Sequence, residues 1–360
     1  MVEHFKSLQM GFNFFKKDKN KWPQPSTKVY RKKIVEGFSI PAIIHNDQYF
    51  FVDIDVYEDG RVDCWNFEDW EHFKKDVQRG WVVINIPDNQ TISIHGLGAW
   101  EISGGSWQFN QLTFISYVES LIKILNPNWV NIYQYSEKKV NGVIIGENAG
   151  GKIFREVGRP SNDPFTEKLK GESVDLFYKI KDTYFLVKLN VFENSTIQLS
   201  RLEVPVDLDF MTLQKLADEK TLVTDPPPGS EVHIYGLGSF ILTKAFHLTD
   251  IKNKLLEIND LLRKAKGEPT TIQLCREAYE AYLANPTVAA REKLKITYEQ
   301  VPEHERLYVG DMDTKDIPIR MIIYGDQEIE NWSHFLLSKE LDEELPSITV
   351  PKPVDDPGVE

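Results

Sequence analysis

Acidic residues at short spacing are the first candidates for chemistry in this sequence. Asp53 and Asp55 alternate with apolar residues in YFFVDIDVY, a spacing that places both carboxylates on one face of a strand. Two carboxylates so placed can share a divalent cation or a proton, as in metal-assisted hydrolysis. The stretch GDMDTKD places three more carboxylates in one turn, although the glycine and glutamate of an EF-hand loop are not in register. This turn is the best metal candidate in the sequence, and its ligands would be Asp311, Asp313 and Asp316.

Histidine and cysteine supply little further chemistry. The eight histidines include no H-x-H, H-x-x-x-H or H-E-x-x-H spacing, so a histidine metal site would have to be assembled wholly by the fold. Cys64 and Cys275 lie far apart and form neither a disulfide framework nor a zinc motif. We therefore predict no cofactor, and we favour a protein that is not an enzyme.

Tryptophan is distributed unevenly and suggests a contact surface. Trp70 and Trp100 fit a core, because aromatic residues occupy the corresponding positions of a repeated segment described below. Other tryptophans have no such counterpart and lie near acidic residues, a combination typical of a protein-binding hot spot. The predicted partner-binding residues are Trp65, Trp81, Trp107, Asp63, Glu68 and Asp69.

An internal duplication positions these residues. YFFVDIDVYEDGRV from Tyr49 matches YFLVKLNVFENSTI from Tyr184 at an offset of 135, and HGLGAW from His95 matches YGLGSF from Tyr235 at an offset of 140. The five extra residues are expected within SRLEVPVDLD, because insertions collect in surface loops. Each copy alternates polar and apolar residues and then shows helical spacing, which predicts β-β-α-β-β-α, an antiparallel sheet with helices on one face. The second copy has Lys188 and Asn190 in place of Asp53 and Asp55, so the scaffold does not require the two acids.

The predicted fold class is α+β, with two tandem duplicated modules and a C-terminal region. That region should contain a helical hairpin, then a β-hairpin whose polar turn is GDMDTKD, then a helix. We place the divisions at an N-terminal arm (1–35), module 1 (36–160), module 2 (161–268), the C-terminal α+β region (269–345) and an acidic, proline-rich tail (346–360).

Composition restricts the classes of partner. The chain has 55 acidic and 42 basic residues and a net charge of −13, which opposes binding to a phosphate backbone. It shows no run of 18 apolar residues and no apolar signal-peptide segment. We expect a cytoplasmic protein that binds neither nucleic acid nor membrane, with its oligomeric state left open.

Three functions are compatible with these patterns. The first is a non-catalytic protein that captures a basic protein partner, of the immunity, antitoxin or defence-associated inhibitor type known in bacteria. The second is a metal-assisted hydrolase that uses Asp53 and Asp55 or the turn Asp311–Asp316. The third is a sensor that binds a small molecule between the two modules. We favour the first, because no catalytic constellation is visible.

Overall fold

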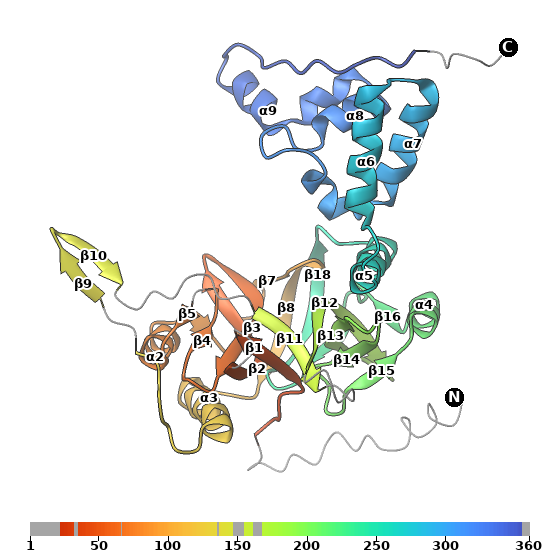
Figure 1. The fold of residues 1–360 in the computed structure, drawn as a ribbon. Helices are drawn as coiled ribbons and strands as arrows, with labels where there is room; N and C mark the ends of the chain where they lie inside the picture. The colour runs from red at the N-terminus through yellow and green to blue at the C-terminus, as the bar shows by residue number, and fades with distance from the viewer. Residues whose placement is uncertain are drawn as a thin grey trace.

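A computed structural model describes residues 22–31, 35–65, 67–134, 137–146, 155–160 and 168–354. The protein is a mixed α+β structure, in which one large sheet flanked by helices is followed by a C-terminal helical region (Figure 1). The first half contains β1 (Thr27–Arg31), β2 (Val35–Asn46), β3 (Gln48–Tyr57), β4 (Val62–Asp63), β5 (Phe67–Glu68), α2 (Trp70–Gln78), β6 (Val82–Val83), β7 (Thr91–Ile94), β8 (Gly98–Trp107) and α3 (Gln111–Leu125). A separate hairpin follows, made of β9 (Glu137–Val140) and β10 (Val143–Gly146).

The second half repeats the first element by element. It contains β11 (Arg155–Pro160), β12 (Lys168–Ile180), β13 (Thr183–Phe192), β14 (Ile197–Ser200), β15 (Val206–Leu208), α4 (Phe210–Asp218), β16 (Leu222–Val223), β17 (Glu231–Ile234), β18 (Gly238–Phe246) and α5 (Ile251–Ala265). The predicted internal repeat and the α+β class are confirmed. Strand β1, which the sequence analysis assigned to the N-terminal arm, is the counterpart of β11.

Ten of the strands close into a ring that both halves share. Its order is β1, β2, β3, β7, β8, β18, β17, β13, β12, β11 and back to β1. The pairs β3–β7 and β13–β17 are parallel and the other eight are antiparallel. The expectation of two antiparallel sheets is therefore wrong in this respect: one mixed sheet runs through both halves. Neither half completes the ring alone, because β1–β11 and β8–β18 join one half to the other.

The strand register reveals a pseudo-twofold axis. Val29 of β1 pairs with Val157 of β11, and Ile102 of β8 pairs with Leu242 of β18. Each pair joins a residue to its own counterpart in the repeat, since β1 and β11 stand in matching register on β2 and β12, and β8 and β18 match at the offset of 140. Two identical segments that pair with each other in this way are related by a twofold rotation.

Three hydrophobic cores hold the ring and its helices together. The first-half core packs α2 and α3 on the sheet, and the second-half core packs α4 and α5 on the sheet. The third core fills part of the ring interior with side chains from both halves, including Trp100, Phe177, Leu186 and Phe240. Strands of the ring are thus covered on both faces, which stabilises the shared sheet by burial of apolar area.

The two Gly-Leu-Gly motifs form the bends between β7 and β8 and between β17 and β18. Gly98 and Gly238 adopt φ values of +144° and +158°, in a region that disfavours other residues. A Cβ on Gly238 would lie 2.4 Å from the carbonyl oxygen of Ser106, and one on Gly98 would lie 3.0 Å from Leu248 Cδ2. The glycines therefore permit β8 and β18 to approach the opposite half closely.

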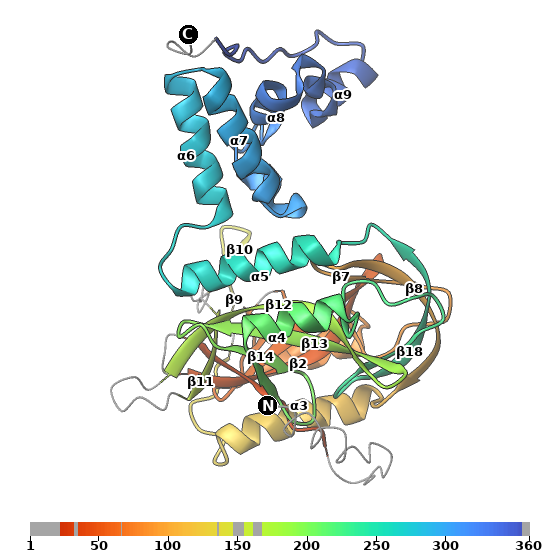
Figure 2. The same cartoon turned by 90° about the vertical axis from the view of Figure 1, so that its right-hand side faces the viewer.

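The C-terminal region lies beyond α5, on one side of the ring (Figure 2). Its elements are α6 (Thr271–Ala284), α7 (Val288–Gln300), η1 (Glu303–Tyr308), α8 (Ile317–Tyr324), η2 (Asp326–Asn331) and α9 (Ser333–Glu340). The predicted β-hairpin is wrong. Pro318 stands in the first turn of α8, where its fixed φ favours a helix start, and Ile317, Ile319, Met321 and Ile322 are buried in the core of this region. Strand-like alternation of short apolar runs cannot be told from a buried helix by pattern alone.

The proline-rich tail is partly folded onto these helices. Val350 is buried, and Tyr282 donates a hydrogen bond of 2.7 Å to the carbonyl oxygen of Pro351. Val354 pairs with Thr287 at the start of α7. Residues 346–354 therefore belong to the folded C-terminal region.

Candidate functional site

Trp65 and Trp81 form an aromatic patch on the first half. Trp65 is 51% exposed and its ring centroid lies 5.3 Å from that of Phe50 and 6.1 Å from that of Trp81, in edge-to-face contact with Trp81. The backbone of Trp65 has φ +81°, which is rare for a bulky residue and is found where the surrounding structure imposes it. Arg79 lies over the ring of Trp81 at 6.0 Å. We call Phe50, Trp65 and Trp81 the aromatic patch.

The second half has no such patch at the matching positions. Ser200 replaces Trp65 and is fully buried, and Thr221 replaces Trp81. Phe185 corresponds to Phe50 but is only 6% exposed. The scaffold therefore does not require exposed aromatic residues at this place.

The other predicted contact residues are not all at this surface. Trp107 is half-buried and packs on Phe240 at the β8–β18 seam, with ring centroids 5.9 Å apart. Asp69 is 4% exposed because it caps α2, where its carboxylate accepts the His72 backbone N–H at 2.8 Å. Asp63 is half-exposed in β4, two residues before Trp65. Glu68 lies in β5, and its side chain is outside the part of the chain that the structure describes.

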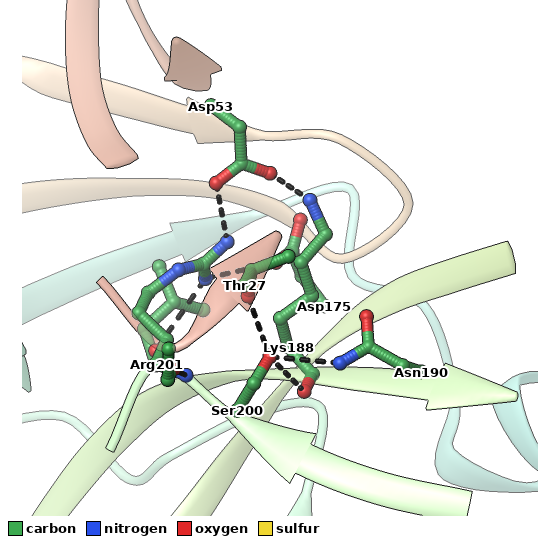
Figure 3. A network of polar contacts seen from close by, with 9 residues as sticks. Thr27, Asp53, Asp175, Lys188, Asn190, Ser200 and Arg201 are labelled. Carbon is green, nitrogen blue, oxygen red and sulfur yellow. Dashed lines mark hydrogen bonds and ion pairs between the residues drawn. The ribbon is translucent and has the colours of Figure 1, made fainter. Parts of the chain in front are cut away.

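Asp53 and Asp55 face the ring interior instead of solvent. Asp55 is 2% exposed. Asp53 forms ion pairs with Lys188 and with Arg201, the latter at 2.9 Å (Figure 3). Lys188 is the counterpart of Asp53 in the repeat, so equivalent positions carry opposite charges and meet across the axis. Both Asp53 oxygens are engaged by cationic side chains, which disfavours metal binding at this carboxylate.

Arg201 joins the interior network and was missed by the sequence analysis. Its guanidinium also pairs with Asp175 at 2.9 Å, and its side chain is 5% exposed. Burial opposes its charge, but Asp53 and Asp175 outweigh that effect, and the pKa of Arg201 is raised. Ser200 extends the network by accepting hydrogen bonds from Thr27 at 3.0 Å and from Asn190 at 2.9 Å (Figure 3).

A cavity lies beside this network, between the two halves. Its volume is about 20 Å³, room for about one water molecule, and its lining includes Pro23, Ser39, Asp53, Tyr117, Arg201 and Tyr235. Residues 23–27 form one side of this lining, and the preceding Trp22 stacks on Phe109 and contacts Tyr117, with ring centroids 5.6 and 5.9 Å away.

The acidic turn of the C-terminal region does not gather its carboxylates. Asp311 accepts hydrogen bonds from the backbone N–H groups of Thr314 at 2.6 Å and Asp313 at 2.9 Å, and these bonds lower the pKa of Asp311. Asp316 is 9% exposed and accepts the Tyr298 hydroxyl at 2.6 Å. Asp313 is exposed. Two of the three predicted metal ligands are thus occupied by contacts within the chain.

A different ionisable cluster lies where the ring meets the C-terminal region. Glu257 of α5, His304 and Glu305 of η1 each place one ligating atom within 4.8 Å of the other two, and they are the only such group of three among the described residues. Lys254, 1% exposed, donates to Glu257 at 2.6 Å. We call Glu257, His304 and Glu305 the junction cluster.

Burial and crowding perturb the junction cluster. Burial, followed by repulsion from Glu257 and Asp260, raises the pKa of Glu305 to about 7. Burial, with Lys254 and His95, lowers the pKa of His304 against the opposing effect of Glu257. Groups with shifted pKa values in a partly enclosed site are candidates for function.

The comparison with known proteins identifies a family. The sequence matches the family described as "Domain of unknown function (DUF7638)" over residues 25–129 and 160–269, which together exceed half of the chain. The chain belongs to this family. Its two matched segments cover the two halves of the ring, except for all but the last residue of β11. Residues 270–346 match a second family, "Domain of unknown function (DUF7639)", which corresponds to the C-terminal region.

No curated protein and no solved structure matches the chain. None of the helices in the described ranges combines the length and the apolar character that crossing a membrane requires.

Proposed function

We propose that this protein captures a protein partner through the aromatic patch of its first half. The main evidence is the conformation of Trp65, whose side chain is 51% exposed, whose backbone has φ +81° and whose ring contacts those of Phe50 and Trp81. An exposed tryptophan supported by other rings supplies a large contact area with little loss of side-chain entropy on binding. Bulky side chains at positive φ are concentrated at functional sites.

The chemistry of the partner follows from charge. The chain carries a net charge of −13, which accelerates encounter with a basic protein. The exposed face of Trp65 is suited to an arginine or lysine, which binds an indole ring by cation–π contact. Asp63, two residues before Trp65 in sequence, is a half-exposed carboxylate on the same segment. We therefore propose a basic protein partner, as for an immunity- or antitoxin-type inhibitor.

The repeat supports this assignment. Ser200 and Thr221 show that the fold accommodates small residues where the first half has Trp65 and Trp81. Trp81 packs partly against the first-half core, but core packing does not account for Trp65, which is 51% exposed. Contact with another molecule would account for it, because tryptophan is enriched at the centres of protein interfaces.

The test places a photo-crosslinking amino acid at position 65 of the full-length protein in its source cell. We expect it to trap one basic protein, while the same amino acid at position 211 traps none. Met211 is a matched control, because it is 74% exposed and lies on α4 in the second half.

The trapped protein is then purified and titrated against defined variants. Trp65→Ala/Trp81→Ala should weaken binding by at least about 30-fold, the effect of losing a hot spot of about 2 kcal/mol. Met211→Ala should leave affinity unchanged, and added salt should slow association. Equal affinity of the double tryptophan variant and the wild type would refute the proposal, as would trapping of an acidic partner.

A further inference from the structure

The junction cluster joins two parts of the chain that belong to different families. Glu257 lies on α5, within the second ring half, whereas His304 and Glu305 lie on η1 of the C-terminal region. A further contact links the same elements, because the Glu303 backbone N–H donates to Asn253 Oδ1 at 3.3 Å. The cluster is therefore positioned by both parts.

The pseudo-twofold axis provides an internal reference for this cluster. At the offset of 140, Glu257 corresponds to Tyr117, Lys254 to Phe114 and His95 to Tyr235. At the symmetry-related contact between α3 and the second-half bend, Tyr117 and Tyr235 line one cavity and Trp22 lies against Tyr117. The positions that correspond to Glu257, Lys254 and His95 are thus all aromatic in this contact between a Gly-Leu-Gly bend and a helix.

At the junction the matching positions carry ionisable residues. A Cβ on Gly96 of the first-half bend would lie 2.9 Å from Lys254 Nζ, so α5 lies directly against this bend. The carboxylates and imidazoles at the junction are therefore additional to what packing requires. Their chemistry needs a separate explanation.

His304 has an unmet bonding requirement. Its Nε2 lies 3.5 Å from Glu257 Oε2, and its Nδ1 is buried with no hydrogen-bond partner among the described residues. A buried ring nitrogen without a partner is costly, and coordination of a cation by the imidazole satisfies one nitrogen.

The charge balance also suits a cation. Glu257, Glu305 and the neighbouring Asp260 oppose one ammonium group, that of Lys254. The acidic groups at the junction outnumber this ammonium group, and a bound cation would offset their repulsion. Lys254 holds Glu257 Oε2 at 2.6 Å and leaves Oε1 for the ion, an arrangement in which an outer residue orients a ligand.

We propose that Glu257, His304 and Glu305 bind one divalent transition-metal cation, with Zn²⁺ the preferred ion. Imidazole combined with carboxylates selects the Zn²⁺ class over Mg²⁺ and Ca²⁺, which prefer oxygen ligands alone. The ion ties η1 to α5 and so fixes the C-terminal region on the ring. Three protein ligands leave a fourth position of a tetrahedral ion for water.

Metal content of the full-length protein gives the first test. The protein is stripped with a chelator and dialysed against ZnCl₂, and the bound zinc is counted by mass spectrometry. We expect one Zn²⁺ per chain, displaced by Mn²⁺ or Co²⁺ in excess and retained in excess Mg²⁺. A wild-type protein that is folded and binds no stoichiometric Zn²⁺ overturns the proposal.

Variants locate the ion. Glu257→Gln and Glu305→Gln keep the side-chain shape, and each should weaken Zn²⁺ binding by at least about tenfold, as should His304→Ala. Asp311→Asn/Asp313→Asn, in the acidic turn, should keep wild-type affinity. Zinc should raise the melting temperature of the wild type and of the turn variant, and it should leave that of Glu257→Gln unchanged. Retention of zinc by all three junction variants, or its loss in the turn variant, overturns the assignment.

Discussion

Two contacts related by the pseudo-twofold axis place a bend against a helix with different chemistry. In one, the bend at Tyr235 lies beside Tyr117 of α3, which Trp22 contacts. In the other, the bend that begins at His95 lies beside Lys254 of α5, near His304 of η1. Since a bend lies against a helix in both cases although the residue types differ, the fold requires the contact and not the residue types. Positions where the halves differ in chemistry are therefore the places to look for function.

Among variants that change symmetry-related positions, one that breaks the interior ion pair Asp53–Lys188 should cause the largest loss of stability. Lys188→Asp makes the two counterparts identical and leaves Asp53, Asp175 and the new acid facing Arg201 alone. Removal of one partner from a buried ion pair costs about 3–5 kcal/mol, and urea denaturation should show a loss of at least that size.

The reciprocal exchange is the control for that variant. Asp53→Lys/Lys188→Asp restores one positive and one negative charge at the axis, and it should recover part of the lost free energy of unfolding. If the double variant is no more stable than Lys188→Asp, direct pairing across the axis is not the cause.

Substitutions in the two Gly-Leu-Gly bends should cause the next largest losses of stability, and the two losses should differ. Gly238→Ala places a Cβ 2.4 Å from the Ser106 carbonyl oxygen, whereas Gly98→Ala places it 3.0 Å from Leu248 Cδ2 and 3.1 Å from the carbonyl oxygens of Phe246 and His247. We expect Gly238→Ala to cost about 3 kcal/mol and Gly98→Ala about 1–2 kcal/mol, because the contact at Gly238 is the closer one and can be relieved only by moving backbone. Equal losses in thermal denaturation would contradict the difference seen between the two seams.

Helix caps provide a smaller comparison. Asp69 caps α2 from a buried position and Asp209 caps α4 from an exposed one, each by accepting a backbone N–H bond. Asp69→Ala should cost about 1–2 kcal/mol, and Asp209→Ala should lower the melting temperature by less.

The pH dependence of the exposed cap has a definite sign. The hydrogen bonds from Thr212 lower the pKa of Asp209 below its ordinary value of 3.8. A lowered pKa contributes stability that is present above pH 3.8 and is lost as the pH falls through the folded-state value. The melting-temperature difference between wild type and Asp209→Ala should therefore shrink in acid, and a difference that grows in acid would be inconsistent with this cap.

A variant at the junction cluster gives the smallest expected change in stability. Lys254→Phe/Glu257→Tyr installs on α5 the residue types that α3 has at the matching positions, Phe114 and Tyr117. Replacement of a buried ion pair by apolar residues is often neutral or stabilising, so we expect the free energy of unfolding to change by less than about 1 kcal/mol. Unfolding of this variant would show that the contact at α5 cannot accept the residues found at the matching contact of α3.

The sequence predicted the repeat and its offsets because the alternation of polar and apolar residues can be compared directly between two contiguous segments. It could not show that the polar face of β3 lies inside a closed ring. Alternation is ordinarily read as one buried and one solvated face, and here the polar face is buried against a second copy. Asp53 and Lys188 would have indicated this, because opposite charges at repeated positions fit a pair across an axis.

The functional residues were harder to predict for a related reason. Arg201 comes directly after β14 and belongs to no recognisable motif. Glu257 and His304 are far apart in sequence and come together only because η1 packs on α5. An alignment of the copies held the one usable signal, which is the replacement of Tyr117 by Glu257 and of Tyr235 by His95. The turn at Asp311 was prominent in sequence, yet its carboxylates serve the local backbone and Tyr298.

Closure of the ring restricts how another molecule can be recognised. Each of its ten strands has a neighbour on both sides over at least part of its length, so the ring leaves a guest peptide little vacant main-chain edge to extend as an extra strand. Recognition by this part of the protein must then depend on side chains that project from its outer surface, and sequence changes at those positions can alter specificity while the hydrogen-bonded frame stays intact.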